Sequence, residues 1–195
     1  MPRICSSREQ SAAGGNPGNG LPEVQLSSKP SLISLKLNAA RSGSVFPLSS
    51  ASSTVWTWRS GRRPGVALPP AWFCGFTPQG SQISRCVVQP MMTLGYRVGG
   101  LALNGSVRPG PQQIGLSVGH LQLARAAAIT GAKAQVSYND GQSWKPVSVA
   151  SSGGGNFRIG FTAPGGVDVT LRVSATDAAG GSITETILRA YRVTF

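Results

Sequence analysis

The residue types that perform acid–base or nucleophilic chemistry are sparse in this sequence. A serine hydrolase needs a base beside its serine, and the single histidine, His120, is the one candidate. His120 follows a glycine at the end of a predicted strand, and no serine stands in a Gly-x-Ser-x-Gly turn. A strand-end histidine is more often incidental than catalytic. The sequence therefore predicts no catalytic residues.

The carboxylates and cysteines form no catalytic or metal-binding pattern either. Asp140, Asp168, Asp177 and Glu185 lie in or beside separate predicted turns and strands, unlike the paired carboxylates of a glycosidase. The cysteines and the lone histidine lack the spacing of a zinc site. A phosphate-binding Gly-Lys-Ser/Thr loop is also missing. We expect no metal and no cofactor, and we do not predict an enzyme.

Two of the three cysteines, Cys74 and Cys86, bracket a short loop that contains Gly, Pro and Ser. A disulfide is the better interpretation, because closing such a loop would stabilise it by about 3 kcal/mol. The bond would persist only in an oxidising compartment. The alternative is a pair of unreactive thiols in a cytosolic protein. Cys5 lies in a polar tail and is expected either to stay a free thiol or to be absent from the mature chain.

One short motif combines turn-forming residues with a tryptophan. Asn139, Asp140 and Gly141 tolerate the positive φ angles of a tight hairpin, and Trp144 is expected to fold back over the turn. The pattern is similar to the Asp box of sialidases and related β proteins, which is a structural hairpin and not a catalytic element. The residues of this predicted structural hairpin are Ser137, Asn139, Asp140, Gly141, Ser143 and Trp144.

Three other tryptophans and one basic cluster are candidates for a binding surface. The tryptophans would serve as a carbohydrate platform or a base-stacking surface if their rings were exposed. We favour the alternative that Trp56 and Trp58 pack in a core and Trp72 covers the cysteine loop, because tryptophan is highly buried on average. The basic cluster is Arg59, Arg62 and Arg63, in a turn with Gly and Pro.

The elements that must position these residues are short strands. Apolar and polar residues alternate in seven runs, and glycine-rich turns separate them, as in a sandwich of antiparallel strands. Leu121 to Ile129 has the composition of a helix but is short and uncapped. We therefore predict an all-β chain with an immunoglobulin-like sandwich in the C-terminal half. The alternating runs are 33–37, 54–60, 92–98, 114–118, 134–138, 157–161 and 167–175.

The predicted domain organisation has three parts. Residues 1–30 are rich in Ser, Gly, Pro and Asn and are predicted to be a disordered tail, since they have too little apolar surface to offset the entropy of ordering. Residues 31–107 form a β-rich segment with the cysteine loop. This segment is a smaller β unit, and the sequence does not decide whether the unit is complete. Residues 108–195 form the immunoglobulin-like sandwich.

The net charge of +12 would draw the chain toward polyanions. The basic residues are spread from Arg3 to Arg192, however, and spread charge is more typical of a solvated surface than of a nucleic-acid site. Nucleic acid is therefore not favoured as a partner. No apolar run approaches the ~20 residues of a membrane span, and no apolar signal-peptide region follows the basic residues near Met1.

From about Leu32 onward the sequence resembles the C-terminal, non-protease region of secreted actinobacterial subtilisin-like serine peptidases. The protease domain of that family, with its Asp, His and Ser motifs, is absent, so no catalytic residue carries over. The stretches that carry the resemblance are Thr54-Val-Trp-Thr-Trp-Arg-Ser60, Leu68-Pro-Pro-Ala-Trp-Phe-Cys74, Cys86-Val-Val-Gln-Pro-Met-Met-Thr-Leu-Gly-Tyr-Arg97, Val136-Ser-Tyr-Asn-Asp-Gly-Gln-Ser-Trp144 and Leu171-Arg-Val-Ser-Ala-Thr-Asp-Ala-Ala-Gly180.

The resemblance implies an extracellular, non-catalytic accessory module. Its expected partner is a peptidase catalytic domain or a cell-surface or extracellular polymer. The second hypothesis is a polyanion- or glycan-binding β module that uses its basic surface and its tryptophans.

Overall fold

The computed structural model describes residues 29–61, 65–69, 71–76 and 79–195, and these residues fall into two compact units. One unit contains Ser34–Trp58 and Val88–Phe195, and the other contains Arg59–Val87 together with residues 29–33. The predicted disordered tail lies almost entirely outside the described residues. The described part is all-β, as predicted, and residues 121–128 contain no helix.

Ten strands of the chain form one sheet, in the order β1-β2-β12-β11-β8-β9-β10-β7-β5, with β6 paired to β12. Every pair with a resolved register is antiparallel except β6 with β12. The strands are β1 (Ser31–Ala40), β2 (Ala51–Ser60), β5 (Met92–Val98), β6 (Ser106–Val107), β7 (Gly110–His120), β8 (Ile129–Ser137), β9 (Lys145–Gly153), β10 (Asn156–Ala163), β11 (Val167–Asp177) and β12 (Ser182–Val193).

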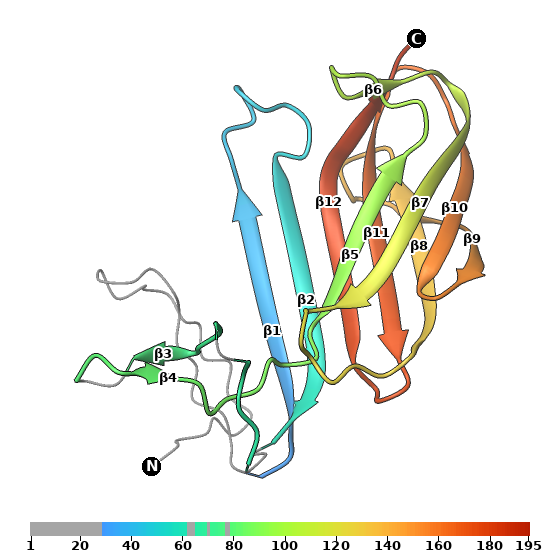
Figure 1. The fold of residues 1–195 in the computed structure, drawn as a ribbon. Helices are drawn as coiled ribbons and strands as arrows, with labels where there is room; N and C mark the ends of the chain where they lie inside the picture. The colour runs from blue at the N-terminus through green and yellow to red at the C-terminus, as the bar shows by residue number, and fades with distance from the viewer. Residues whose placement is uncertain (1–28, 62–64, 70, 77–78) are drawn as a thin grey trace. The chain divides into compact units, whose positions relative to one another are not determined.

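The sheet folds over on itself into two layers. Figure 1 shows β5, β7 and β10 lying across β12, β11 and β8. Strand β9 joins the layers, because it pairs with β8 at its start and with β10 from Ser148 onward. The immunoglobulin-like topology itself stays a prediction.

The core lies between the layers and comes from alternate residues of their strands. Ile114 and Ile159 from one layer meet Val169 and Val173 from the other, and all four are fully buried. On β7 and β10 the neighbours of these residues, such as Gln113 and Arg158, are exposed, which is the period of two predicted from the sequence. Burying one large aliphatic side chain stabilises the folded state by about 1.5–3 kcal/mol. This core is therefore the main source of stability.

All seven predicted strand runs lie in or overlap strands, but the long strands β9 and β12 and the two-residue strands β3, β4 and β6 were not predicted. β12 is hard to recognise because Glu185 and Arg189 interrupt the row of apolar residues Ile183, Ile187, Tyr191 and Val193. Arg189 lies where the register shifts against β11, and it has a positive φ. The predicted boundary at residue 107 stays a prediction. β5 lies before that boundary and pairs with β7, and β2 pairs with β12, so both join the sheet of the C-terminal strands.

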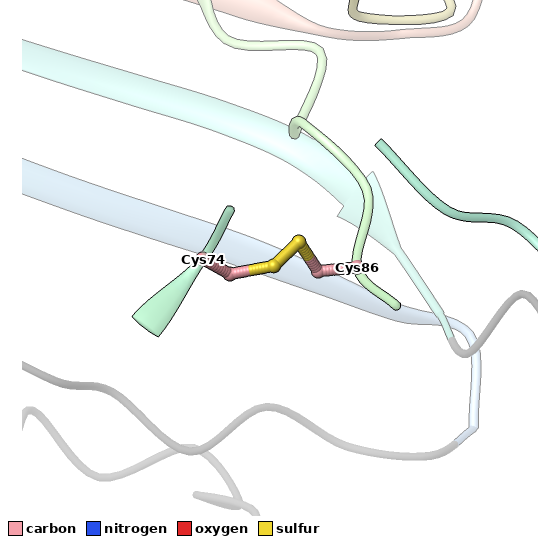
Figure 2. Close-up of a disulfide and its surroundings, with 2 residues drawn as sticks. All are labelled: Cys74 and Cys86. Carbon is pink, nitrogen blue, oxygen red and sulfur yellow. A yellow bond between two sulfur atoms is a disulfide. The ribbon is translucent and has the colours of Figure 1, made fainter. Parts of the chain in front are cut away.

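The smaller unit is built around the cysteine loop. Its two-stranded sheet consists of β3 (Gly75–Phe76) and β4 (Gln82–Ile83), and Cys74 and Cys86 flank this sheet. The two cysteines form a disulfide, with their Cα atoms 6.4 Å apart (Figure 2). The prediction of this bond is confirmed. Cys5 lies outside the described residues.

A search of the described residues found no helix long and apolar enough to cross a membrane.

Candidate functional site: an arginine held by the Asp-box-like turn

The turn between β8 and β9 is held together by the side chains of its own motif. The Ser137 hydroxyl donates to Asn139 Oδ1 at 2.8 Å and accepts the backbone N–H of Gly141 at 2.9 Å. Asn139 Oδ1 also accepts the N–H of Ser143 at 2.9 Å, and Asn139 Nδ2 donates to the Ser143 hydroxyl. Asp140 and Gly141 have φ angles of 56° and 88°, the left-handed region that Asp and Gly tolerate.

This turn fixes the position of Trp144. A Cβ atom added to Gly141 would lie 3.2 Å from the Trp144 ring, so the ring packs directly over the glycine. On β11, the Arg172 guanidinium stacks on Trp144, with 3.8 Å between Cζ and the ring centroid. Arg172 Nε donates to the Thr186 hydroxyl on β12 at 3.3 Å. The turn motif therefore holds Trp144 in place, and Trp144 in turn holds Arg172.

The turn is also tied to the sheet through Asp140. Arg189 reaches Asp140 with two hydrogen bonds, of 2.9 Å from Nε and 2.6 Å from Nη2. These charge-assisted bonds hold the pKa of the Asp140 carboxyl below its usual range. The backbone N–H of Arg189 donates to the hydroxyl of Thr170, which is buried in β11. The irregularity in β12 thus supplies the cation that anchors the turn.

Arg172 borders a groove where β8 and β9 separate. The two strands pair only from Ala134↔Val147 to Val136↔Lys145, and β9 then pairs with β10 instead. The groove combines small apolar residues with two cations and two neutral hydrogen-bonding groups. Its lining is Ala132, Ala134, Pro146, Val147 and Val149, with Lys133, Arg172, Gln135 and Ser174.

At the opposite end of β8 and β11, His120 and Asp177 form a buried pair. His120 Nε2 lies 3.0 Å from Asp177 Oδ2, and the two side chains are 6% and 2% exposed. Asp177 Oδ1 also accepts the backbone N–H groups of Ala179 and Gly181, which closes the turn between β11 and β12. His120 thus has a structural contact that links the two layers, since it lies on β7 and Asp177 lies on β11.

The remaining carboxylates are engaged as well. Asp168 accepts two hydrogen bonds from Arg192, at 2.7 and 3.1 Å. Glu185 accepts the Tyr96 hydroxyl at 2.8 Å and the Thr54 hydroxyl at 3.3 Å. Burial together with the nearby Glu185 carboxylate raises the pKa of Tyr96 far above its usual value. All four carboxylates between residues 29 and 195 thus hold partners within the fold.

The tryptophans proposed for a binding surface differ in exposure. Trp58 is only 5% exposed, and its indole N–H donates to Gln89 Oε1 at 3.0 Å, so the idea that Trp58 forms a surface platform is wrong. Trp56 packs against the core, and its N–H donates to the Met92 carbonyl at 2.8 Å. Trp72, in the smaller unit, is 47% exposed.

The basic cluster is described only in part. Arg59 is exposed at the end of β2, whereas Arg62 and Arg63 lie outside the described residues. Arg172, which stacks on Trp144 in the larger unit, was not identified from the sequence. Its partner Trp144 lies 28 positions earlier in the chain, so no local spacing points to the pair. A search of the described residues for groups of His, Cys, Asp and Glu that could hold a metal ion found none.

Comparison of the sequence with protein-family models and with curated proteins finds no match. The resemblance to the C-terminal regions of subtilisin-like peptidases therefore rests on the motifs quoted above.

Proposed function

We propose that this chain is a non-catalytic, extracellular accessory module that acts by binding a partner, as expected for the C-terminal region of a subtilisin-like peptidase. The observation that carries the proposal is that the described acid–base side chains are engaged in structural contacts. His120 and the four described carboxylates all hold structural contacts, whereas Arg172 is ordered and has no carboxylate partner among the described residues. Such a distribution suits recognition better than acid–base chemistry.

The environment of His120 argues against a role as a general base. A base must reach the proton of a nucleophile or of a bound substrate. Here Nε2 faces Asp177, and the side chain is almost fully buried. In the described part of the chain, no serine, threonine or cysteine side chain is hydrogen-bonded to His120.

Hydrolysis assays test the non-catalytic proposal. We expect the purified full-length chain to cleave neither casein nor small ester substrates. A His120→Gln variant serves as the matched control for trace contamination, because a contaminating peptidase would act equally in both preparations. Turnover that a serine-directed inhibitor abolishes, and that His120→Gln also lacks, would overturn the proposal.

The disulfide supports export, since such bonds persist in oxidising compartments. Peptide mapping without reductant, on chain made in an oxidising compartment, should show the link between Cys74 and Cys86. Cys5 should remain open to alkylation. Three free thiols in that material would remove the support for an extracellular location.

A second candidate function is polyanion binding, and the charge balance favours it. Because the four described carboxylates already have partners, cations such as Arg97 and Arg158 on β5 and β10 stay without a carboxylate among the described residues. Titration with heparin and with duplex DNA at two salt concentrations tests this function. Binding should weaken steeply with salt, and its absence at ~150 mM salt, near physiological screening, would exclude it.

A further inference from the structure

The groove beside Arg172 combines three features that point to one kind of ligand. The first is the guanidinium itself. Stacking on Trp144 and the hydrogen bond to Thr186 fix its plane, while its two Nη groups have no hydrogen-bonding partner among the described residues. A fixed guanidinium plane suits bidentate binding of a carboxylate, and its low remaining freedom reduces the entropy cost of binding.

The second feature is backbone that has no ladder partner. On the side of β8 that faces β9, only Ala134, Gln135 and Val136 are paired in the described structure. The stretch from Ile129 to Lys133 pairs with β11 on its other side alone. Free strand edges of this kind accept extended polypeptide segments through main-chain hydrogen bonds.

The third feature is the mixed lining. Ala132, Val147 and Val149 offer apolar contact, and Lys133 adds a second cation near Arg172. Lys133 lies opposite Ser174, and Arg172 lies opposite Gln135, so the two cations are diagonal neighbours on one face. The apolar lining does not favour a polysaccharide, and the groove has no aromatic lining on which a nucleic-acid base would stack.

We propose that this groove binds a short, extended, acidic segment of a partner protein. The segment's backbone pairs with the free edge of β8, its apolar side chains lie on the alanines and valines, and a carboxylate pairs with Arg172. The inference rests on the proposed accessory function only in requiring a protein partner. It also gives the Asp-box-like turn a role in positioning, because the turn holds Trp144 and Trp144 holds Arg172.

Selection from a phage-displayed library of random octapeptides on the full-length chain tests the proposal. The selected peptides should place Asp or Glu among alternating apolar residues. In ¹⁵N–¹H correlation spectra, such a peptide should shift amide signals of residues 129–135, 145, 147–149 and 172–174. Neutral or basic selected sequences, no enrichment, or shifts confined to other strands would overturn the proposal.

Matched charge variants distinguish a specific binding site at Arg172 from general attraction to anions. Arg172→Gln should weaken binding of the selected peptide by about tenfold or more, as for a lost charge-assisted hydrogen bond. Arg172→Lys should bind less tightly than wild type, because it keeps the charge but loses the planar fork. Arg158→Gln removes the same charge from an exposed position on β10 and should change binding by less than about twofold.

Equal losses of peptide affinity in Arg158→Gln and Arg172→Gln would contradict binding in the groove and would indicate general attraction to anions. That outcome would leave the non-catalytic accessory function standing, because the hydrolysis assays test that function separately. An unchanged near-ultraviolet circular dichroism spectrum for each variant checks that the fold is intact.

Discussion

Two charged side chains on the same strand, β11, illustrate two uses of charge in one fold. Near one end, Asp177 is buried, faces His120 and accepts two backbone N–H groups. In the middle of the strand, Arg172 is only half-buried and lies on Trp144, with no carboxylate partner among the described residues. Both side chains are held in place, but only Arg172 keeps hydrogen-bonding capacity for a ligand.

The difference suggests how to separate structural from functional polar groups in such a fold. A buried group whose partners are all internal contributes to stability, and its removal leaves those partners unpaired. An ordered group with unused donors contributes little to stability and much to binding. Substitutions at the two positions should therefore affect different measurements.

The largest effect is expected for Asp177→Ala. This change leaves His120 buried without its partner and removes the acceptor of two backbone N–H groups, so we expect a loss of about 3–5 kcal/mol in the free energy of unfolding. Urea denaturation followed by tryptophan fluorescence measures it. Asp168→Ala, which breaks the more exposed pair with Arg192, is the control and should cost less than about 1 kcal/mol. Equal costs for the two variants would refute a structural role for Asp177.

A smaller effect is expected for Trp144→Leu. The variant loses the stacking with Arg172 and the contact over Gly141, which together should lower the free energy of unfolding by about 1–2 kcal/mol. Peptide binding should fall as well, because Arg172 is no longer held in one orientation. The same denaturation assay and a peptide titration provide both values. A variant that loses stability but binds the peptide as wild type does would contradict the inference that the turn positions Arg172 for binding.

The smallest effect concerns the ion pair of Asp140 with Arg189. The pKa of Asp140 is lowered in the folded protein, so the pair stabilises the fold above the unfolded pKa of about 4 and loses that contribution as the pH falls through the folded pKa. Wild type should therefore exceed Asp140→Asn in stability at pH 7, and the gap should narrow at pH 3. Unfolding at both pH values measures the gap, and a gap that widens in acid would contradict the assignment.

The sequence predicted those features whose signals are local. Alternation gave the all-β class and seven strand runs, and Cys74 and Cys86 were paired from their spacing and loop. The turn residues from Ser137 to Trp144 likewise suggested a hairpin, because its hydrogen bonds join residues close in sequence.

Contacts between distant segments could not be predicted in this way. His120 and Asp177 lie 57 residues apart, and only the packing of the two layers brings them together. Trp144 and Arg172 are also distant in sequence, and the pairing of β8 with β11 inside one layer brings the turn after β8 close to Arg172. β12 was missed because Glu185 and Arg189 interrupt the alternation of apolar and polar residues that identifies a strand. The average burial of tryptophan favoured a packed position for Trp56 and Trp58, and both pack in or against the core. It could not give the 47% exposure of Trp72.

The comparison of Asp177 with Arg172 is tested most directly by measuring stability and binding on Arg172→Gln. Its free energy of unfolding should lie within about 1 kcal/mol of wild type, as for the loss of a half-exposed cation on an aromatic ring. Its affinity for the selected acidic peptide should fall about tenfold or more. Wild-type affinity with a loss of stability as large as that of Asp177→Ala would contradict the account, because Arg172 would then be structural.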